Sequence, residues 1–203
     1  PLRGHAVKAA ANHGGSVNIL GTRIAKSLVL VLGTVAALLG GLSAGASAAQ
    51  LLLEENFSYT ATTALIATGF WTAHSTGINP ITTSTPGLIY SGYPASGIGN
   101  SVTLTSSGED DSRAFVPQVS SGSIYYAFLV SIPSAGATGD YFIHLGPSPI
   151  GTTFNARVYC KASGSNLVFA VAKSSTAPTT YTASTYATGT THLIVVKYAF
   201  NSV

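Results

Sequence analysis

The sequence predicts an all-β fold, a two-sheet antiparallel β-sandwich of the jelly-roll type, for the residues that follow position 48. Three observations support this prediction. After residue 50, apolar residues recur at every second position in short runs, which is the period of a β-strand. The runs are separated by Gly, Pro, Ser and Asn, residues that favour turns. Charged residues make up only 7% of the chain, a composition typical of extracellular β-proteins.

A β-hairpin is the clearest single element. Apolar residues alternate with polar ones on both sides of a Gly- and Ser-rich turn at 161–166. The inward positions are expected to be Phe154, Ala156, Val158 and Cys160 on the first strand, and Leu167, Phe169 and Val171 on the second.

Two other runs, 124–132 and 192–200, are apolar on both faces and are predicted to be central strands covered on each side. Two sheets packed face to face would bury Phe128, Phe154 and Phe169. A final strand as apolar as 192–200 normally continues into a turn and a partner strand. We therefore expect the domain to continue past Val203. Further strands are expected at 51–57, 87–90, 100–105, 112–117, 140–146 and 179–186.

Residues 23–48 have the order of a secretory signal peptide. Arg23 and Lys26 precede an apolar run, and small residues lead to an Ala-Ser-Ala site that predicts cleavage after Ala48. An uncleaved membrane anchor is the alternative. A spanning helix needs about 20 strongly apolar residues, however, and the apolar run here is shorter than that. We therefore expect a secreted or cell-surface domain over 49–203. Residues 1–22 are expected to lie outside the fold, as an unstructured or wrongly started leader.

The formal net charge of +3 does not indicate a nucleic-acid partner, because the excess of basic residues lies before residue 49. A nucleic-acid binder needs a basic stripe along its surface, which the remaining charges do not supply. The lone cysteine, Cys160, cannot form an internal disulfide and is expected to be a core thiol. From residue 49 onward the sequence has five basic residues (Arg113, Arg157, Lys161, Lys173, Lys197) and six acidic ones (Glu54, Glu55, Glu109, Asp110, Asp111, Asp140).

Several segments from residue 51 to the end resemble laminin-G-like, concanavalin A-like jelly-roll domains of secreted Bacteroidota proteins, which often carry a C-terminal sorting tail. The resemblance implies a jelly roll that lacks its closing strands. The segments that carry it are Leu-Leu-Leu-Glu-Glu-Asn-Phe-Ser-Tyr at 51–59, Gly-Phe-Trp-Thr-Ala-His at 69–74, Gly-Glu-Asp-Asp-Ser-Arg-Ala-Phe at 108–115, Ser-Ile-Tyr-Tyr-Ala-Phe-Leu-Val-Ser at 123–131 and Gly-Asp-Tyr-Phe-Ile-His-Leu-Gly at 139–146.

The resemblance covers lectins, adhesion modules, glycosidases and lyases, so it leaves the function open. We expect a non-catalytic module for glycan binding, adhesion or architecture. One alternative is an accessory domain of a larger secreted polysaccharide-degrading enzyme. Another is a carbohydrate-active enzyme using acids such as Glu109 or Asp140. Enzymes of this superfamily place two acids at i and i+4 on one strand, a spacing that this sequence lacks.

The acidic turn Glu109, Asp110 and Asp111 is a candidate Ca²⁺ site, because Ca²⁺ prefers carboxylate oxygens on loops. Laminin-G-like domains often bind this ion at a sandwich edge, which the resemblance extends to this turn. We favour the other interpretation, a solvated turn in which Asp110 or Asp111 pairs with Arg113. No other cofactor is expected.

Four residues in Gly-rich stretches are candidates for ligand binding. Trp71 lies near His74, and an exposed indole face can stack on the sugar rings of a polysaccharide or cell-surface glycan. Tyr90 and Tyr93 on a predicted loop have the same capacity. For Trp71 we favour the other interpretation, in which it caps the core, since aromatic side chains favour burial.

Overall fold

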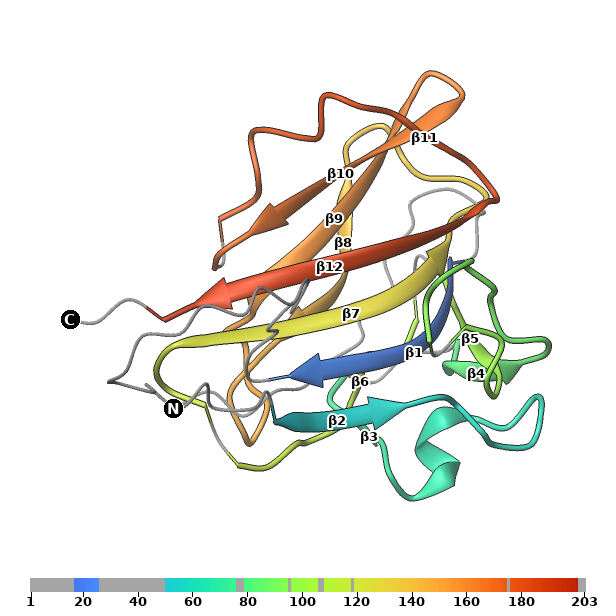
Figure 1. The fold of residues 1–203 in the computed structure, drawn as a ribbon, viewed down its shortest axis with the longest axis vertical. Coiled ribbons are helices and arrows are strands. Elements are labelled where there is room, and N and C mark those ends of the chain that lie inside the picture. Colours follow the sequence, from blue (N-terminus) through green and yellow to red (C-terminus); the bar gives the residue numbers. More distant parts are fainter. Residues whose placement is uncertain are drawn as a thin grey trace, which may run out of the picture.

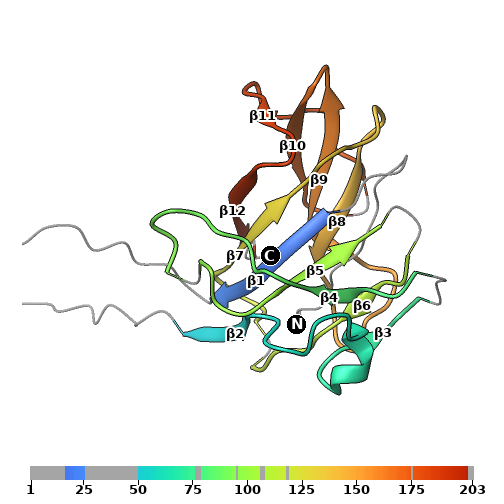
Figure 2. The same ribbon diagram turned by 90° about the vertical axis from the view of Figure 1, so that its right-hand side faces the viewer.

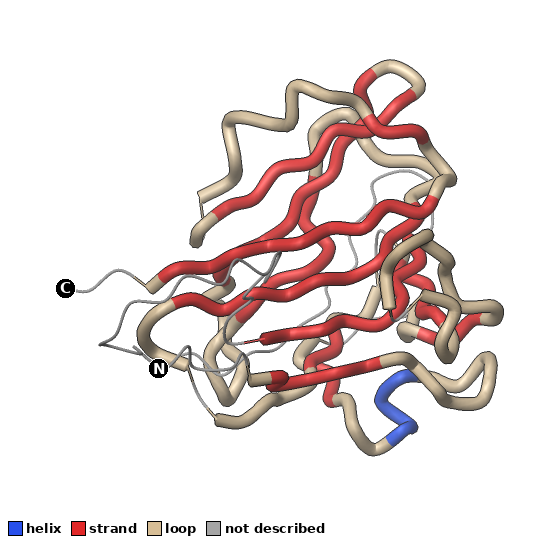
Figure 3. The backbone as a smooth tube through the Cα atoms, in the orientation of Figure 1, coloured by secondary structure: helices blue, strands red, loops and turns tan. Residues whose placement is uncertain are grey.

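The computed structural model describes residues 17–25, 50–75, 79–94, 96–105, 108–117, 119–174 and 176–200. Strands dominate these residues and form antiparallel sheets, so the all-β prediction is confirmed (Figures 1 and 3). The helical element that they contain is one short 3-10 turn, η1 (Leu65–Thr68).

The larger described sheet has six strands. Its order is β12-β7-β1-β5-β4, and β2 pairs with β1 outside this path. Strand β7 therefore lies inside the sheet, as predicted for 124–132, whereas β12 lies at one end of it. The strands are β12 (Thr191–Ala199), β7 (Ser123–Ser131), β1 (Val17–Ala25), β5 (Ser101–Leu104), β4 (Thr82–Ser84) and β2 (Leu51–Glu55).

The smaller sheet contains the predicted hairpin, formed by β9 and β10, which pair without interruption from Ser163 and Asn166 outward. Its order is β11-β10-β9-β8, and a separate short ladder joins β3 to β6. The strands are β11 (Tyr186–Ala187), β10 (Asn166–Ala172), β9 (Asn155–Ser163), β8 (Asp140–Leu145), β3 (Thr72–Ala73) and β6 (Asp111–Ser112).

One apolar core is shared by the two larger sheets, which Figure 2 shows from the side. Phe128 of β7 and Phe169 of β10 both belong to it, as predicted, and the ring of Phe128 lies edge-on to Phe142 of β8. Cys160 is also buried there, and burial raises the pKa of its thiol to about 12. The sulfur is therefore a protonated core group at neutral pH.

Phe154 is not in this core, contrary to the sequence prediction. It packs with Tyr141 and Tyr159 in a second cluster on the other face of the smaller sheet. The cause is Ala156, whose φ of 49° interrupts the alternation at the start of β9. A prediction that assumes a regular period of two therefore turns Phe154 to the wrong face.

Three predicted strands differ from the structure. Residues 87–90 form a loop on which Ile89 is exposed, and β4 takes the position beside β5 instead. In 179–186 only Tyr186 is in a strand, because Thr182 bonds to Phe169 at a single position. In 112–117 only Ser112 is in a strand.

Strand β1 was not expected, since we predicted that residues 1–22 lie outside the fold. It pairs with β2, β5 and β7, and it supplies backbone partners that β5 and β7 would otherwise lack inside the sheet. Residues 23–25, the start of the predicted signal peptide, belong to the same strand. Residues 1–16 and 26–49 lie outside the described residues, so the signal peptide stays a prediction.

Replacing Gly99 by alanine is expected to lower the free energy of unfolding by roughly 2–4 kcal/mol. Gly99 has φ +70°, and a Cβ atom there would overlap the carbonyl oxygen of Asn56. Gly92 is the matched control, because it has φ +81° with open space around it. Gly92→Ala should cost only about 1 kcal/mol. Equal losses in urea unfolding of the two variants would contradict the predicted overlap.

Candidate functional site

Glu55, at the end of β2, is a buried carboxylate that accepts hydrogen bonds from four groups. Its Oε1 accepts the N–H of Phe57 at 2.6 Å. Its Oε2 accepts the hydroxyl of Tyr59 at 2.8 Å, the indole N–H of Trp71 at 3.1 Å and Nη1 of Arg113. The adjacent Glu54 is only half-buried, as expected for neighbours on a strand. This arrangement satisfies the charge of Glu55 and ties three segments to β2.

Arg113 therefore pairs with Glu55, and the predicted pairing of Arg113 with Asp110 or Asp111 is wrong. Its guanidinium also lies over the ring of Phe70, 5.1 Å from the centroid. Burial and the bond to Glu55 raise the pKa of Tyr59. The polar groups of this network thus form hydrogen bonds with one another, which is typical of a structural cluster.

The four candidate ligand-binding residues lie in three different surroundings. Trp71 is buried, donates to Glu55 and stacks on Phe57, so its ring is a core element and is not open to a sugar. His74 packs edge-on beside His144 and Phe154. Tyr90 and Tyr93 lie on the loop between β4 and β5, where Tyr90 is 39% exposed. These residues do not form one common site.

The acidic turn places Asp111 in β6, where its side chain is completely buried. Among the described residues, no amide or hydroxyl group donates a hydrogen bond to either of its carboxylate oxygens or to Oε1 of Glu109. Burial, together with the charge of Glu109, a hydrogen bond between the two carboxyl groups and the charge of Asp110, raises the pKa of Asp111 to about 7. A carboxyl in such surroundings favours its protonated form.

Within the described ranges, no three or more His, Cys, Asp or Glu side chains gather closely enough to hold a metal ion. Carbonyl oxygens also serve Ca²⁺, and the carbonyl oxygen of Asn79 accepts the N–H of Glu109 beside the turn. Ca²⁺ binding at Glu109, Asp110 and Asp111 therefore stays a prediction.

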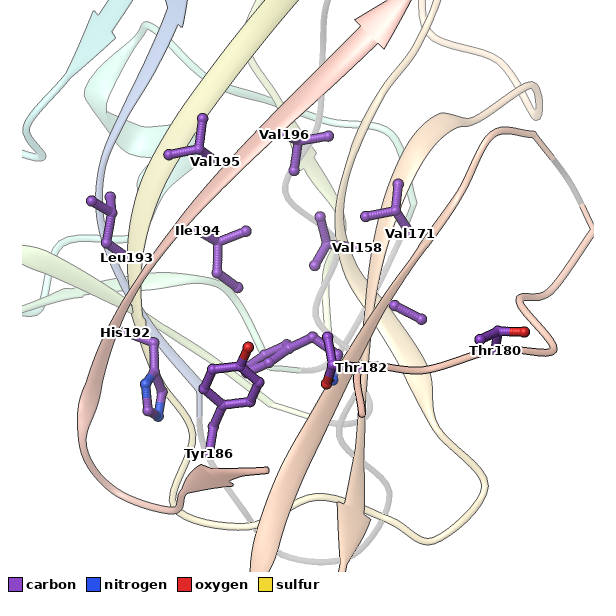
Figure 4. Close-up of a pocket in the computed structure, with 12 residues that line it drawn as sticks. Val158, Val171, Thr180, Thr182, Tyr186, His192, Leu193, Ile194, Val195 and Val196 are labelled. Carbon is purple, nitrogen blue, oxygen red and sulfur yellow. The ribbon is translucent and has the colours of Figure 1, made fainter. Parts of the chain in front are cut away.

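A groove opens between β10 of the smaller sheet and β12, the end strand of the larger sheet (Figure 4). We call it the β10–β12 groove. It has a volume of about 440 Å³. Ile194 and Val196 of β12 face Val158 of β9 and Val171 of β10 across it (Figure 4), and Phe169 also lines it. Aliphatic side chains from both sheets therefore line a concave surface that remains open to solvent.

The polar groups of this groove gather at one end, around Thr182, Tyr186 and His192 (Figure 4). Nε2 of His192 lies 2.8 Å from the carbonyl oxygen of Ala187, which can only accept, so Nε2 carries the hydrogen. The imidazole also lies edge-on to Tyr186, with ring centroids 5.5 Å apart. The described lining residues include no Asp or Glu. The groove can thus bind an apolar group and orient it at one polar end.

No protein-family model, curated protein or solved structure matches this chain. The resemblance to laminin-G-like domains therefore rests on the sequence segments alone. Among the described residues, no helix is long and apolar enough to cross a membrane.

Sequence reasoning missed the groove because its lining residues have the pattern of a core. The run 192–200 was predicted to be covered on both sides, whereas Val195 on β12 is 54% exposed. The available signal was the single charge, Lys197, in an otherwise apolar strand. Edge strands commonly carry such a residue, since a lysine discourages unwanted pairing.

Proposed function

We propose that this protein is a non-catalytic binding module, an exported β-sandwich of the jelly-roll type, that holds its ligand in the β10–β12 groove and serves adhesion. The observation that supports this is the concave apolar surface between β10 and β12. A pocket of about 300–1,000 Å³ that is lined mostly by apolar side chains, with a few polar groups to orient the ligand, is the usual form of a binding site. The shared core and the antiparallel sheets are consistent with the sandwich.

Adhesion to a protein is favoured over glycan binding by the chemistry of the lining. Sugar sites combine an open aromatic face with several hydrogen-bonding groups along the site. Here Ile194, Val196, Val158 and Val171 offer aliphatic surface, and the aromatic and hydroxyl groups gather at one end. Trp71, the one tryptophan of the chain, is buried away from solvent. The best-fitting ligand is therefore a polypeptide with apolar side chains.

Binding should be measured for the whole protein against a panel of soluble polysaccharides and a library of short peptides, together with the variant Val171→Lys. Val171 lines the groove and is 53% exposed, so a lysine there places a charge in the groove at little cost to folding. We expect peptide binding in the wild type that falls at least about tenfold in Val171→Lys, because the charge must be desolvated.

Val116→Lys is the matched control, since Val116 is 73% exposed on a loop outside the groove. It should bind like the wild type. Binding that Val171→Lys leaves unchanged would place the ligand elsewhere. Binding of a polysaccharide alone would replace adhesion by glycan recognition, and turnover of a polysaccharide would replace the binding role by catalysis.

A further inference from the structure

We propose that β1 is a detachable strand of the larger sheet, and that the position between β7 and β5 is a strand-acceptor site for residues 17–25. Cleavage after Ala48, which the sequence predicts, would separate this strand from the domain that holds it. The inference goes beyond the proposed function, because it concerns how the sheet is assembled and not the ligand of the β10–β12 groove.

β1 lies inside the larger sheet and joins strands that have no other described ladder in common (Figure 1). The strand order places it between β7 and β5, and β2 pairs with it outside this path. Without β1, the described ladders of this sheet are two separate pairs, β12 with β7 and β5 with β4. β2 is then left without a described strand partner. One strand therefore holds the six strands together.

Both edges of β1 are occupied by antiparallel partners. On one side, residues 17–19 pair with β5 and residues 22–25 pair with β2. On the other side, residues 18–25 pair with β7, with a shift of register between Leu20 and Arg23. Removal of β1 would therefore leave backbone N–H and C=O groups of β7, β5 and β2 without their strand partners. Such a position can accept a strand again, because unpaired backbone groups along an edge are a template for pairing.

The loss of β1 would reach the apolar core through β2. Leu52 and Leu53 of β2 pack against this core, and Glu55 at its end accepts the indole N–H of Trp71 at 3.1 Å. Among the described strands, β2 pairs with β1 alone. Trp71 is the single tryptophan of the chain and is buried. Its fluorescence therefore reports whether β2 is in place.

The predicted cleavage site separates β1 from every strand that it pairs with. β1 ends at Ala25, and its partners β2, β5 and β7 all begin after residue 48. A cut after Ala48 would leave β1 on the released fragment 1–48, joined to the domain by backbone hydrogen bonds and side-chain contacts alone. Processing would thus decide whether the larger sheet keeps its internal strand.

The test uses the whole protein with a protease recognition sequence inserted after Ala48, folded first and cut afterwards. We expect fragment 1–48 to co-elute with 49–203 after the cut, because the ladders of β1 remain formed. Mild urea should separate the two fragments and shift the emission of Trp71 to longer wavelength. The melting temperature of isolated 49–203 should lie at least about 10 °C below that of the uncut chain.

A synthetic peptide of residues 17–25 should restore the emission and the melting temperature of 49–203. A peptide of the same composition in scrambled order is the control and should restore neither. In the uncut chain, Ile19→Pro removes a backbone N–H from β1, whereas the matched control Ile19→Val keeps it. We expect the melting temperature to fall by at least about 5 °C in Ile19→Pro and to change little in Ile19→Val.

Three results would overturn the inference. The first is isolated 49–203 that keeps the Trp71 emission and the melting temperature of the uncut chain. The second is equal restoration, or equal lack of it, by the 17–25 peptide and the scrambled peptide. The third is a wild-type melting temperature in Ile19→Pro. None of these results bears on peptide binding in the β10–β12 groove, which Val171→Lys tests separately.

Discussion

Replacing Glu55 by alanine is expected to lower the free energy of unfolding by roughly 3–5 kcal/mol, the usual cost of removing one partner of a buried ion pair. The substitution leaves the indole N–H of Trp71, the hydroxyl of Tyr59 and the guanidinium of Arg113 without their shared acceptor. In a domain of this size each kcal/mol shifts the melting temperature by roughly 2–4 °C. Thermal unfolding should therefore show a melting temperature that is lower by roughly 6–20 °C, and urea unfolding should show the loss of free energy directly.

Glu54→Ala is the matched control, because the two glutamates are adjacent in β2. Glu54 is half-buried and accepts one long hydrogen bond, at 3.4 Å, from Nδ2 of Asn56. Its removal should change the free energy of unfolding by less than about 1 kcal/mol. Similar losses of unfolding free energy in the two variants would show that the hydrogen bonds of Glu55 add no more stability than a surface acid does.

Replacing Asp111 by asparagine is expected to remove a pH dependence of stability between about pH 4 and pH 7. The folded state holds the pKa of Asp111 at about 7, above its ordinary value of 3.8. Between these values the folded state binds more protons than the unfolded state, so the free energy of unfolding falls as pH rises and levels off above pH 7. The free energy of unfolding of the wild type should fall by on the order of 2–4 kcal/mol over this pH range.

The measurement is urea unfolding of the wild type and of Asp111→Asn at pH 4.5 and pH 8. The wild type should be less stable at pH 8, and Asp111→Asn should reduce this difference and exceed the wild type at pH 8. Glu54→Gln, which removes a different acid from the same domain, should follow the wild type. If the free energy of unfolding of Asp111→Asn depended on pH as it does in the wild type, a raised pKa at this position would be contradicted.

The same variant tests Ca²⁺ binding. Ca²⁺ requires charged carboxylates, so an ion at Glu109 and Asp111 would raise the melting temperature at pH 8 more than at pH 5. Asp111→Asn should remove most of that increase. An equal effect of Ca²⁺ on wild type and variant would place any bound ion away from this turn.

The sequence by itself determined which segments form the long strands. β7, β8, β9, β10 and β12 all lie where alternating or continuous apolar runs predicted them, because burying those side chains requires the extended conformation at that period. The shared burial of Phe128 and Phe169 followed from the same pattern. Glu54 and Glu55 likewise face opposite sides, as two neighbours on a strand must.

Only the tertiary structure decided which residues meet. The bond between Arg113 and Glu55 joins positions 58 residues apart, and no local pattern selects Glu55 over the nearer Asp111. The left-handed conformation of Ala156 turned Phe154 away from the core, although its sequence alternates regularly. The groove arises because β12 ends the larger sheet and β11 covers β10 only at Asn166 and Leu167. Both facts depend on strand order, which apolar periodicity does not contain.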